Sequence, residues 1–205
     1  MSDELELATR ALKHFNEGTT DLAPSQMRIP LSAYTDEQQY QAERQAVFFE
    51  SPIAVALSLE IPEPGDFQTQ TVMDIPLLMT RDRDGRVHCF INVCRHRGAK
   101  VCQAEKGRQS RFSCPYHAWT YNNRGALVGI YGEETFGDVD RDSMGLTELA
   151  CDESAGVIFV CLTPGKTFEL SEWLGEFADK LEDQALHDWH LYTQRHLSGA
   201  GWKAT

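Results

Sequence analysis

Two short segments of the chain combine cysteine with histidine at close spacing. Cys94 and His96 form a C-x-H pattern, and after 17 intervening residues Cys114 and His117 form a C-x-x-H pattern. Thiolate sulfur and imidazole nitrogen together suit either an iron–sulfur cluster or a zinc ion. Zinc fingers usually pair Cys with Cys and His with His, whereas each segment here supplies one of each. Two such loops can place both cysteines on one iron and both histidines on a second iron.

That division of ligands distinguishes a Rieske-type [2Fe–2S] cluster from an all-cysteine cluster. A structural zinc module with no redox role is the alternative that the same four residues allow. The chain has four other cysteines, Cys89, Cys102, Cys151 and Cys161, which we interpret as small buried hydrophobic residues. We see no secretory signal in the sequence, so a disulfide framework is not expected.

The similarity to known proteins extends beyond the four donors. The second segment reads CPYHAWTY, and with the first it resembles the motif of the Rieske non-haem iron oxygenases, the ring-hydroxylating type. Further stretches resemble the N-terminal Rieske part of the large (alpha) subunit of these enzymes. They are 61–66, 92–98, 101–102, 156–160 and the Gly201-Trp202-Lys203 tail, in which the family usually has Asn at the position of Gly201.

The resemblance implies roles for the four donors. Cys94 and Cys114 would hold the buried ferric iron, while His96 and His117 would hold the outer iron that takes up the electron. Respiratory and photosynthetic Rieske proteins add one cysteine to each loop and join the two by a disulfide. This chain has Ala and Tyr at those places, so it fits the oxygenase branch, whose potentials lie near about −150 mV.

The resemblance also implies supporting roles around the donors. Gly98 would let the first loop turn sharply, Pro115 would stiffen the second loop, and Trp119 would cover the cluster. Ala118 stands where the family usually has Gly. If that position needs a positive φ, the alanine is strained by about 1 kcal/mol or more.

The charge of the chain is unevenly distributed. The net charge is −12, which argues against binding to nucleic acid or to an anionic membrane. Residues 95–111 nevertheless carry six cationic side chains and a single anionic one, which favours the reduced cluster and could attract an acidic electron donor. The longest apolar run, 157–162, is too short to span a bilayer. We therefore expect a soluble, cytoplasmic protein.

The pattern of the chain indicates a mainly β fold, a Rieske-type antiparallel β-sandwich with flanking N-terminal and C-terminal helices. Helices are predicted over 2–17, 40–49 and 173–181, and turn residues at 82–86 and 122–125 predict two hairpins. The expected domains are an N-terminal helical arm (1–50), the Rieske [2Fe–2S] domain (51–165), and a helical connector at the start of an absent catalytic domain (166–205).

In the family, a second domain holds a mononuclear Fe(II) on two histidines and a carboxylate, and this chain stops about where that domain should begin. We therefore expect an oxidoreductase subunit whose present residues transfer one electron but hydroxylate nothing. The family further implies a ferredoxin or reductase as electron donor and a trimer-based oligomer that needs the catalytic domain. A stand-alone Rieske electron carrier is the alternative.

Overall fold

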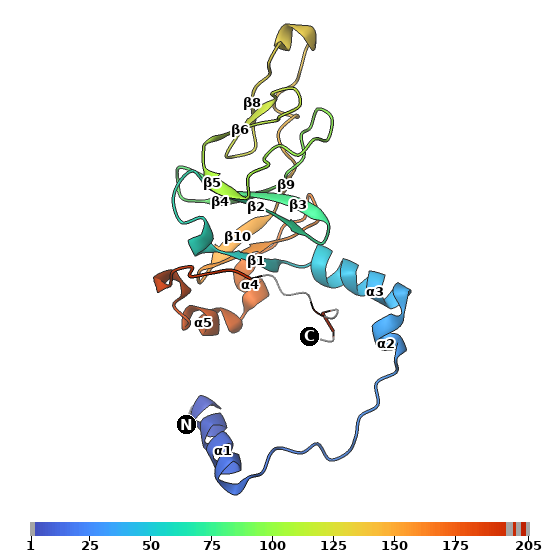
Figure 1. Ribbon diagram of the computed structural model, residues 1–205, viewed down its shortest axis with the longest axis vertical. Coiled ribbons are helices and arrows are strands. Elements are labelled where there is room, and N and C mark those ends of the chain that lie inside the picture. The colour runs from blue at the N-terminus through green and yellow to red at the C-terminus, as the bar shows by residue number, and fades with distance from the viewer. Residues whose placement is uncertain (1–2, 196–198, 200–201, 204–205) are drawn as a thin grey trace. The chain divides into compact units, whose positions relative to one another are not determined.

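The computed structural model describes residues 3–195, 199 and 202–203, so Gly201 of the C-terminal motif lies outside the described residues. The chain divides into two compact units, Met1–Glu37 and Gln38–Thr205. The helices, labelled in Figure 1, are α1 (Asp3–Glu17), α2 (Ser32–Thr35), α3 (Glu37–Glu43), α4 (Leu170–Leu174) and α5 (Phe177–Glu182). A π-helical segment follows α3 at Arg44–Phe49, and short 3-10 turns lie at Ser58–Glu60, Glu133–Thr135 and Leu186–Asp188. No helix within the described part of the chain is long and apolar enough to cross a membrane.

The strands lie in the second unit and form three antiparallel sheets. They are β1 (Ile53–Leu57), β2 (Asp66–Val72), β3 (Ile75–Arg81), β4 (Val87–Ile91), β5 (Lys106–Arg108), β6 (Arg111–Ser113), β7 (Thr120–Asn122), β8 (Leu127–Gly129), β9 (Glu148–Leu149), β10 (Cys151–Ser154) and β11 (Val157–Val160). Their orders are β1-β11-β10, β5-β2-β3-β4-β9 and β6-β7-β8. This arrangement confirms the predicted mainly β, antiparallel fold and both predicted hairpins.

The predicted helices correspond to described elements with two differences. The segment expected as one helix over 40–49 is α3 followed by π-helical turns, in which the Glu50 N–H donates to the Gln45 carbonyl at 3.0 Å. The helix expected over 173–181 is divided into α4 and α5, because Gly175 ends α4 with a positive φ of +49, which glycine adopts readily. Domain limits at residues 50 and 165 stay a prediction.

Strand β3 lies at the centre of the second unit. Its side chains from Leu77 to Arg81 are buried, although successive side chains of a strand point to opposite faces of its sheet. Leu78 therefore enters one core beside Phe90, whereas Leu77 and Met79 enter a second core on the other face. A strand buried on both faces has a continuous apolar sequence, which explains the Leu-Leu-Met run.

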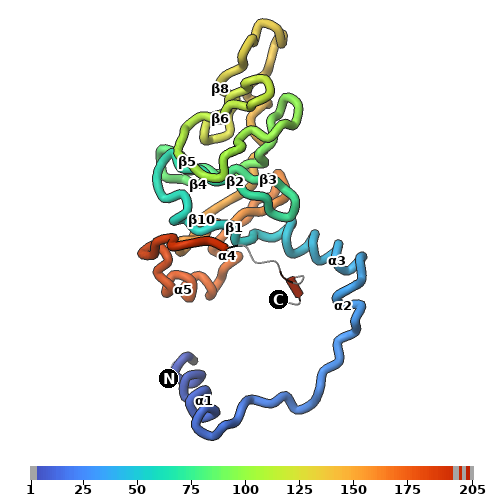
Figure 2. The backbone as a smooth tube through the Cα atoms, viewed as in Figure 1, coloured from blue at the N-terminus to red at the C-terminus, as the bar shows by residue number. Residues whose placement is uncertain are grey.

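The two cores separate successive layers of the second unit, as the ribbon and the backbone tube show (Figures 1 and 2). The β6-β7-β8 sheet packs on one face of the five-stranded sheet, and the β1-β11-β10 sheet packs on the other. Strand β11 alternates in the same way: Ile158 and Val160 face the five-stranded sheet, while Val157 and Phe159 pack under α4 against Leu170.

The hairpin between β7 and β8 is fixed to the hairpin between β3 and β4. The Thr80 hydroxyl donates to the Asn123 carbonyl at 2.6 Å, and the Asn123 side-chain amide donates to the Arg81 carbonyl at 3.3 Å. Arg124 reaches across to Asp82 with an N–O distance of 2.8 Å. These contacts hold the third sheet against the end of β3.

Asp82 is buried and organises the turn of the β3–β4 hairpin. Burial alone would raise its pKa, but hydrogen bonds from His88 and from the backbone N–H groups of Arg86 and Asp84 outweigh burial and lower the pKa to about 2. A carboxyl whose folded pKa is depressed stabilises the fold above its unfolded pKa. The contribution of Asp82 is therefore lost as pH falls from about 4 to about 2.

The third sheet approaches the central sheet closely at Gly125. Its φ is +77, and a Cβ at this position would overlap the ring of Phe90. Gly85 has a similar φ of +82 with no atom within 4 Å of a Cβ.

We expect Gly85→Ala to lower the free energy of unfolding by about 1 kcal/mol from backbone strain, and Gly125→Ala by about 3 kcal/mol because overlap is added. Urea unfolding measures both, and equal losses would contradict the close packing.

Candidate metal centre

The two donor segments form loops with the same backbone hydrogen bonds. The first loop (residues 94–99) and the second loop (residues 114–119) each begin at a cysteine. In each, the cysteine N–H donates to the carbonyl five residues later, from Cys94 to Ala99 and from Cys114 to Trp119, at 2.8 Å in both. The N–H four residues after the cysteine donates back to the cysteine carbonyl at 2.9 Å in both. The two loops therefore present their cysteines in equivalent ways.

The fifth residue of each loop is left-handed. It is Gly98 in the first loop, with φ +72, and Ala118 in the second, with φ +54. The sharp turn predicted at Gly98 is present, and the positive φ considered for Ala118 is also found. A left-handed alanine costs about 1 kcal/mol or more, so the structure around the second loop must hold Ala118 in a backbone conformation that alanine disfavours.

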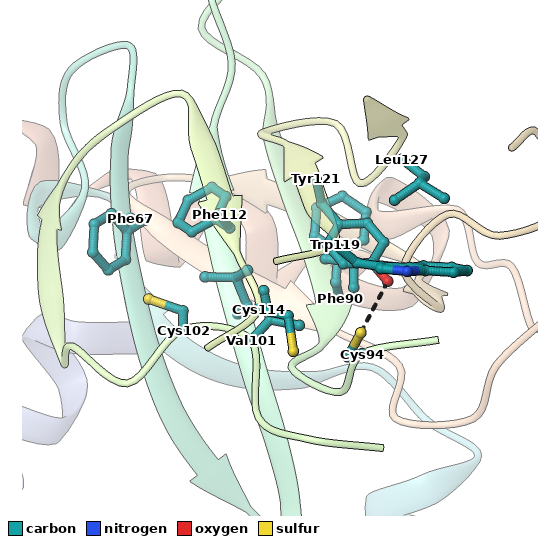
Figure 3. Close-up of a cluster of buried hydrophobic side chains, with 12 residues drawn as sticks. Phe67, Phe90, Cys94, Val101, Cys102, Phe112, Cys114, Trp119, Tyr121 and Leu127 are labelled. Carbon is teal, nitrogen blue, oxygen red and sulfur yellow. Dashed lines mark hydrogen bonds between the residues drawn. The ribbon is translucent and has the colours of Figure 1, made fainter. Parts of the chain in front are cut away.

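The two thiols lie side by side in the core that Leu78 enters. Cys94 and Cys114 are each 3% exposed, and Figure 3 shows them below the rings of Trp119 and Tyr121. Burial raises the pKa of the Cys114 thiol, and the N–H groups of Tyr116 and His117 offset that effect in part. Backbone N–H groups directed at sulfur prepare the site for a thiolate, the form that binds metal.

Tyr121 is a site residue that the sequence analysis did not single out. It is fully buried on β7, and its hydroxyl lies 3.3 Å from the Cys94 sulfur. Because the hydroxyl accepts the Arg95 N–H at 3.1 Å, its own proton is available to the sulfur. Figure 3 marks this contact.

The two histidine rings contact each other and are less buried than the two thiols. The rings of His96 and His117 have centroids 4.7 Å apart and are tilted by 59°. His96 stacks on Trp119 at 5.1 Å with an angle of 10°, and the edge of Phe136 meets it at 5.3 Å. Trp119 thus covers a histidine, and Phe136 is a second aromatic neighbour that sequence reasoning missed.

One nitrogen of His96 fits a metal ligand. Its Nδ1 is buried and has no hydrogen-bond partner among the residues that the structure describes. Burial lowers the pKa of His96, which favours the neutral imidazole that binds metal. An unpartnered buried nitrogen in the same loop as a buried thiol fits a metal cluster better than it fits a packed core. Within the described ranges, no three potential ligands converge on a point that could hold a single ion.

Asn92 closes the segment that contains the first loop. Its side chain is fully buried, donates to the Cys102 carbonyl at 2.9 Å, and accepts the Cys102 N–H at 2.9 Å. The Asn92 N–H donates to the Pro76 carbonyl of β3 at 2.8 Å. These hydrogen bonds join the two ends of residues 92–102 and attach them to the central sheet. Pro115 lies exposed in the second loop, where no hydrogen bond from its nitrogen is needed.

Comparisons with known proteins agree with this geometry. The family model described as the Rieske [2Fe-2S] domain matches residues 51–139. The chain is 34% identical over 165 residues to the oxygenase subunit of glycine betaine monooxygenase from Pseudomonas aeruginosa, covering 79% of this chain and 37% of the relative. It is 33% identical over 179 residues to the large subunit of anthranilate 1,2-dioxygenase from Acinetobacter baylyi, covering 84% and 38%.

Solved structures show the same relationship. The quaternary ammonium Rieske monooxygenase CntA matches with a TM-score of 0.70 and 29% identity, over 76% of this chain and 43% of CntA. Naphthalene 1,2-dioxygenase from Rhodococcus sp. matches with a TM-score of 0.69 and 31% identity, over 88% and 40%. The fold and the paired loops thus define a Rieske protein, whose cofactor is a [2Fe–2S] cluster.

Within that class, the chain is similar to the N-terminal region of Rieske oxygenase large subunits. These relatives are oxidoreductases that their names describe as monooxygenases and dioxygenases. The chain spans 37 to 38% of the length of the two curated relatives named above.

The strain at Ala118 gives a test of loop geometry. Ala118→Gly should raise the free energy of unfolding by about 0.5 to 1 kcal/mol, because relief of the left-handed strain exceeds the added flexibility of the unfolded chain. Ala99→Gly in the first loop is the control, since Ala99 has no positive φ and its replacement should lower stability. Thermal unfolding of both variants decides the matter, and a stability loss in Ala118→Gly would contradict the left-handed conformation.

The Tyr121 hydroxyl gives a test of the sulfur environment. Hydrogen bonds to cluster sulfur stabilise the reduced state, so Tyr121→Phe should lower the midpoint potential by a shift on the order of 40 mV, equivalent to about 1 kcal/mol. Tyr192→Phe, at an exposed tyrosine, is the control and should leave the potential unchanged. A redox titration followed by EPR gives both values. An unchanged potential in Tyr121→Phe would show that this hydroxyl does not bond a cluster sulfur.

Proposed function

We propose that Cys94, His96, Cys114 and His117 hold the Rieske cluster and that this chain is the electron-receiving part of an oxygenase large subunit. The observation that carries the proposal is the buried, unpartnered Nδ1 of His96, in a site whose two thiols are each 3% exposed. Each loop supplies one sulfur and one nitrogen, as a cluster with two cysteine and two histidine ligands requires. The thiols are more buried than the rings, which supports cysteine at the inner iron and histidine at the outer iron.

The residues of the site have separate tasks in this proposal. When bound, the cluster accepts and releases one electron at a time. Cys94 and Cys114 bind as thiolates, and His96 binds as a neutral imidazole whose ring Trp119 keeps in place. The Tyr121 hydroxyl donates to the Cys94 sulfur and adds positive potential beside it. The shared backbone hydrogen bonds fix the shape of both loops, so little rearrangement accompanies a change of charge.

The relatives support a place for this chain in a larger enzyme. One solved structure of a quaternary ammonium Rieske monooxygenase is described in terms of inter-subunit electron transfer. We propose by analogy that a ferredoxin or reductase supplies the electron and that the complete subunit forms trimer-based oligomers. In this proposal the mononuclear Fe(II) and hydroxylation belong to residues outside these 205. The helical arm spans 1–50, the Rieske domain 51–165 and the helical connector 166–205. None of the six cysteines forms a disulfide, which supports a cytoplasmic location.

Purified chain from iron-replete cells tests the cofactor and the ligands together. We expect two irons and two acid-labile sulfides per chain, reversible uptake of one electron, and no substrate-dependent oxygen consumption. Cys114→Ser should abolish the cluster because a thiolate is lost. Cys161→Ser is the control, since Cys161 is equally buried but lies apart from the site, near the Phe49 carbonyl.

Three results would contradict the proposal. Stoichiometric zinc without sulfide would replace it with the structural zinc module. A cluster that survives in Cys114→Ser would remove this residue from the ligand set. Product formation by the isolated chain would show that it contains an iron site for oxygen chemistry.

A further inference from the structure

Residues 130–146, here called the cap segment, make up most of the connection between β8 and β9. Figure 1 shows this connection extending beyond β8 at one end of the second unit. Its two ends lie close together, because the Leu146 N–H donates at 2.8 Å to the carbonyl of Gly125, two residues before β8. A connection of this length with no strand of its own is uncommon in a compact domain, and compact loops with closed ends are frequently functional.

The cap segment contacts the metal centre through Phe136. The ring centroid of Phe136 lies 5.3 Å from that of His96 and 5.9 Å from that of Trp119, with its plane steeply inclined to both. Because Trp119 stacks on His96, the three rings all contact one another. Val139 and Met144 of the same segment pack against the core that contains both thiols. The cap segment therefore supplies one ring contact of His96 and part of the cover of that core.

Few hydrogen bonds attach the cap segment to the rest of the second unit. Within the described part of the chain, the hydrogen bonds of residues 131–145 join residues of the segment itself, with one exception. The exception is the Arg141 guanidinium, which donates to the Val128 carbonyl of β8 at 3.4 Å. A segment with so few attachments opens at a lower free energy than the sheets do, so its internal contacts decide how often it opens.

A bidentate ion pair joins the two arms of the cap segment. Arg141 donates through Nε and Nη2 to the two carboxylate oxygens of Glu133, at 3.0 and 2.5 Å. The Glu133 carbonyl also accepts the Phe136 N–H at 3.0 Å within the 3-10 turn. The ion pair thus fixes the turn that carries Phe136. Bidentate pairs between arginine and a carboxylate are the surface ion pairs that contribute measurably to stability.

We propose that Arg141 is a positioning residue: through its ion pair with Glu133 it keeps Phe136 against His96, and the closed cap segment protects the bound cluster from loss. The inference rests on the proposed function, because there must be a cluster at His96 to protect. Opening of the segment exposes the His96 ring, and a chelator can compete with that imidazole for iron only in the open state. Loss of the ion pair raises the open population about fivefold, which corresponds to about 1 kcal/mol.

Loss of the cluster to an iron chelator, followed by visible absorption of the cluster-loaded chain, tests the proposal. The double variant Glu133→Gln with Arg141→Met removes the ion pair without changing the net charge, and it should lose the cluster about fivefold faster than the parent chain. Arg141→Lys keeps the charge without the bidentate geometry and should lie between the two. The control is Glu50→Gln with Lys166→Met, which should leave the rate unchanged. That ion pair flanks β1 and β11, and its side chains are 47% and 44% exposed, against 45% and 39% for Glu133 and Arg141.

Phe136→Ala separates a positioning role from a general loss of stability. This variant should itself lose the cluster faster than the parent chain. Removal of the ion pair in the Phe136→Ala background should then add nothing, because the ring that the pair positions is gone. Multiplied effects would overturn the proposal, since they would show that the ion pair acts on stability in general. A parental rate of cluster loss in the ion-pair variant would also overturn it and leave the proposed function intact. If the parent chain assembles no cluster, the proposed function fails and this inference with it.

Discussion

The metal centre depends on a backbone constraint that its two loops share. Each loop returns to its own cysteine within five residues, and this closure requires a left-handed fifth residue. Gly98 adopts that conformation freely, whereas Ala118 adopts it under strain. The closed loops direct both thiols into one core. Everything else in the site, from the Tyr121 hydrogen bond to the stacked histidine, acts on loops whose shape is already set.

The loops are equivalent in backbone but offset in their histidines. His96 is the third residue of its loop and His117 is the fourth of its own, yet the rings lie 4.7 Å apart. The two loops therefore bring their histidine rings together even though one has C-x-H spacing and the other has C-x-x-H spacing. The aromatic neighbours of the two histidines also differ. Trp119 stacks on His96 of the opposite loop, whereas Tyr116 packs on His117, its own sequence neighbour.

The sequence predicted the features that rest on short-range patterns. Donor spacing, the Gly98 turn and both hairpins each depend on fewer than about ten neighbouring residues, where turn chemistry acts. The sheet arrangement was beyond such reasoning, because β6, β7 and β8 are each too short to show a period. Tyr121 was missed for a related reason: it contacts Cys94 across 27 positions, and only the packing of β7 brings them together. The proposed ligand set follows from spacing and resemblance, and the unpartnered nitrogen of His96 supports it.

The double burial of β3 limits how the gene of this protein can change. Leu78 serves the core that holds the thiols, while Leu77 and Met79 serve the core behind it. Exchange of one aliphatic residue for another alters the volume of a single core. Insertion or deletion of one residue instead sends every later side chain of the strand to the opposite face. The strand should therefore tolerate substitutions in evolution while its length stays fixed, and length variation should collect in the hairpin turns at either end.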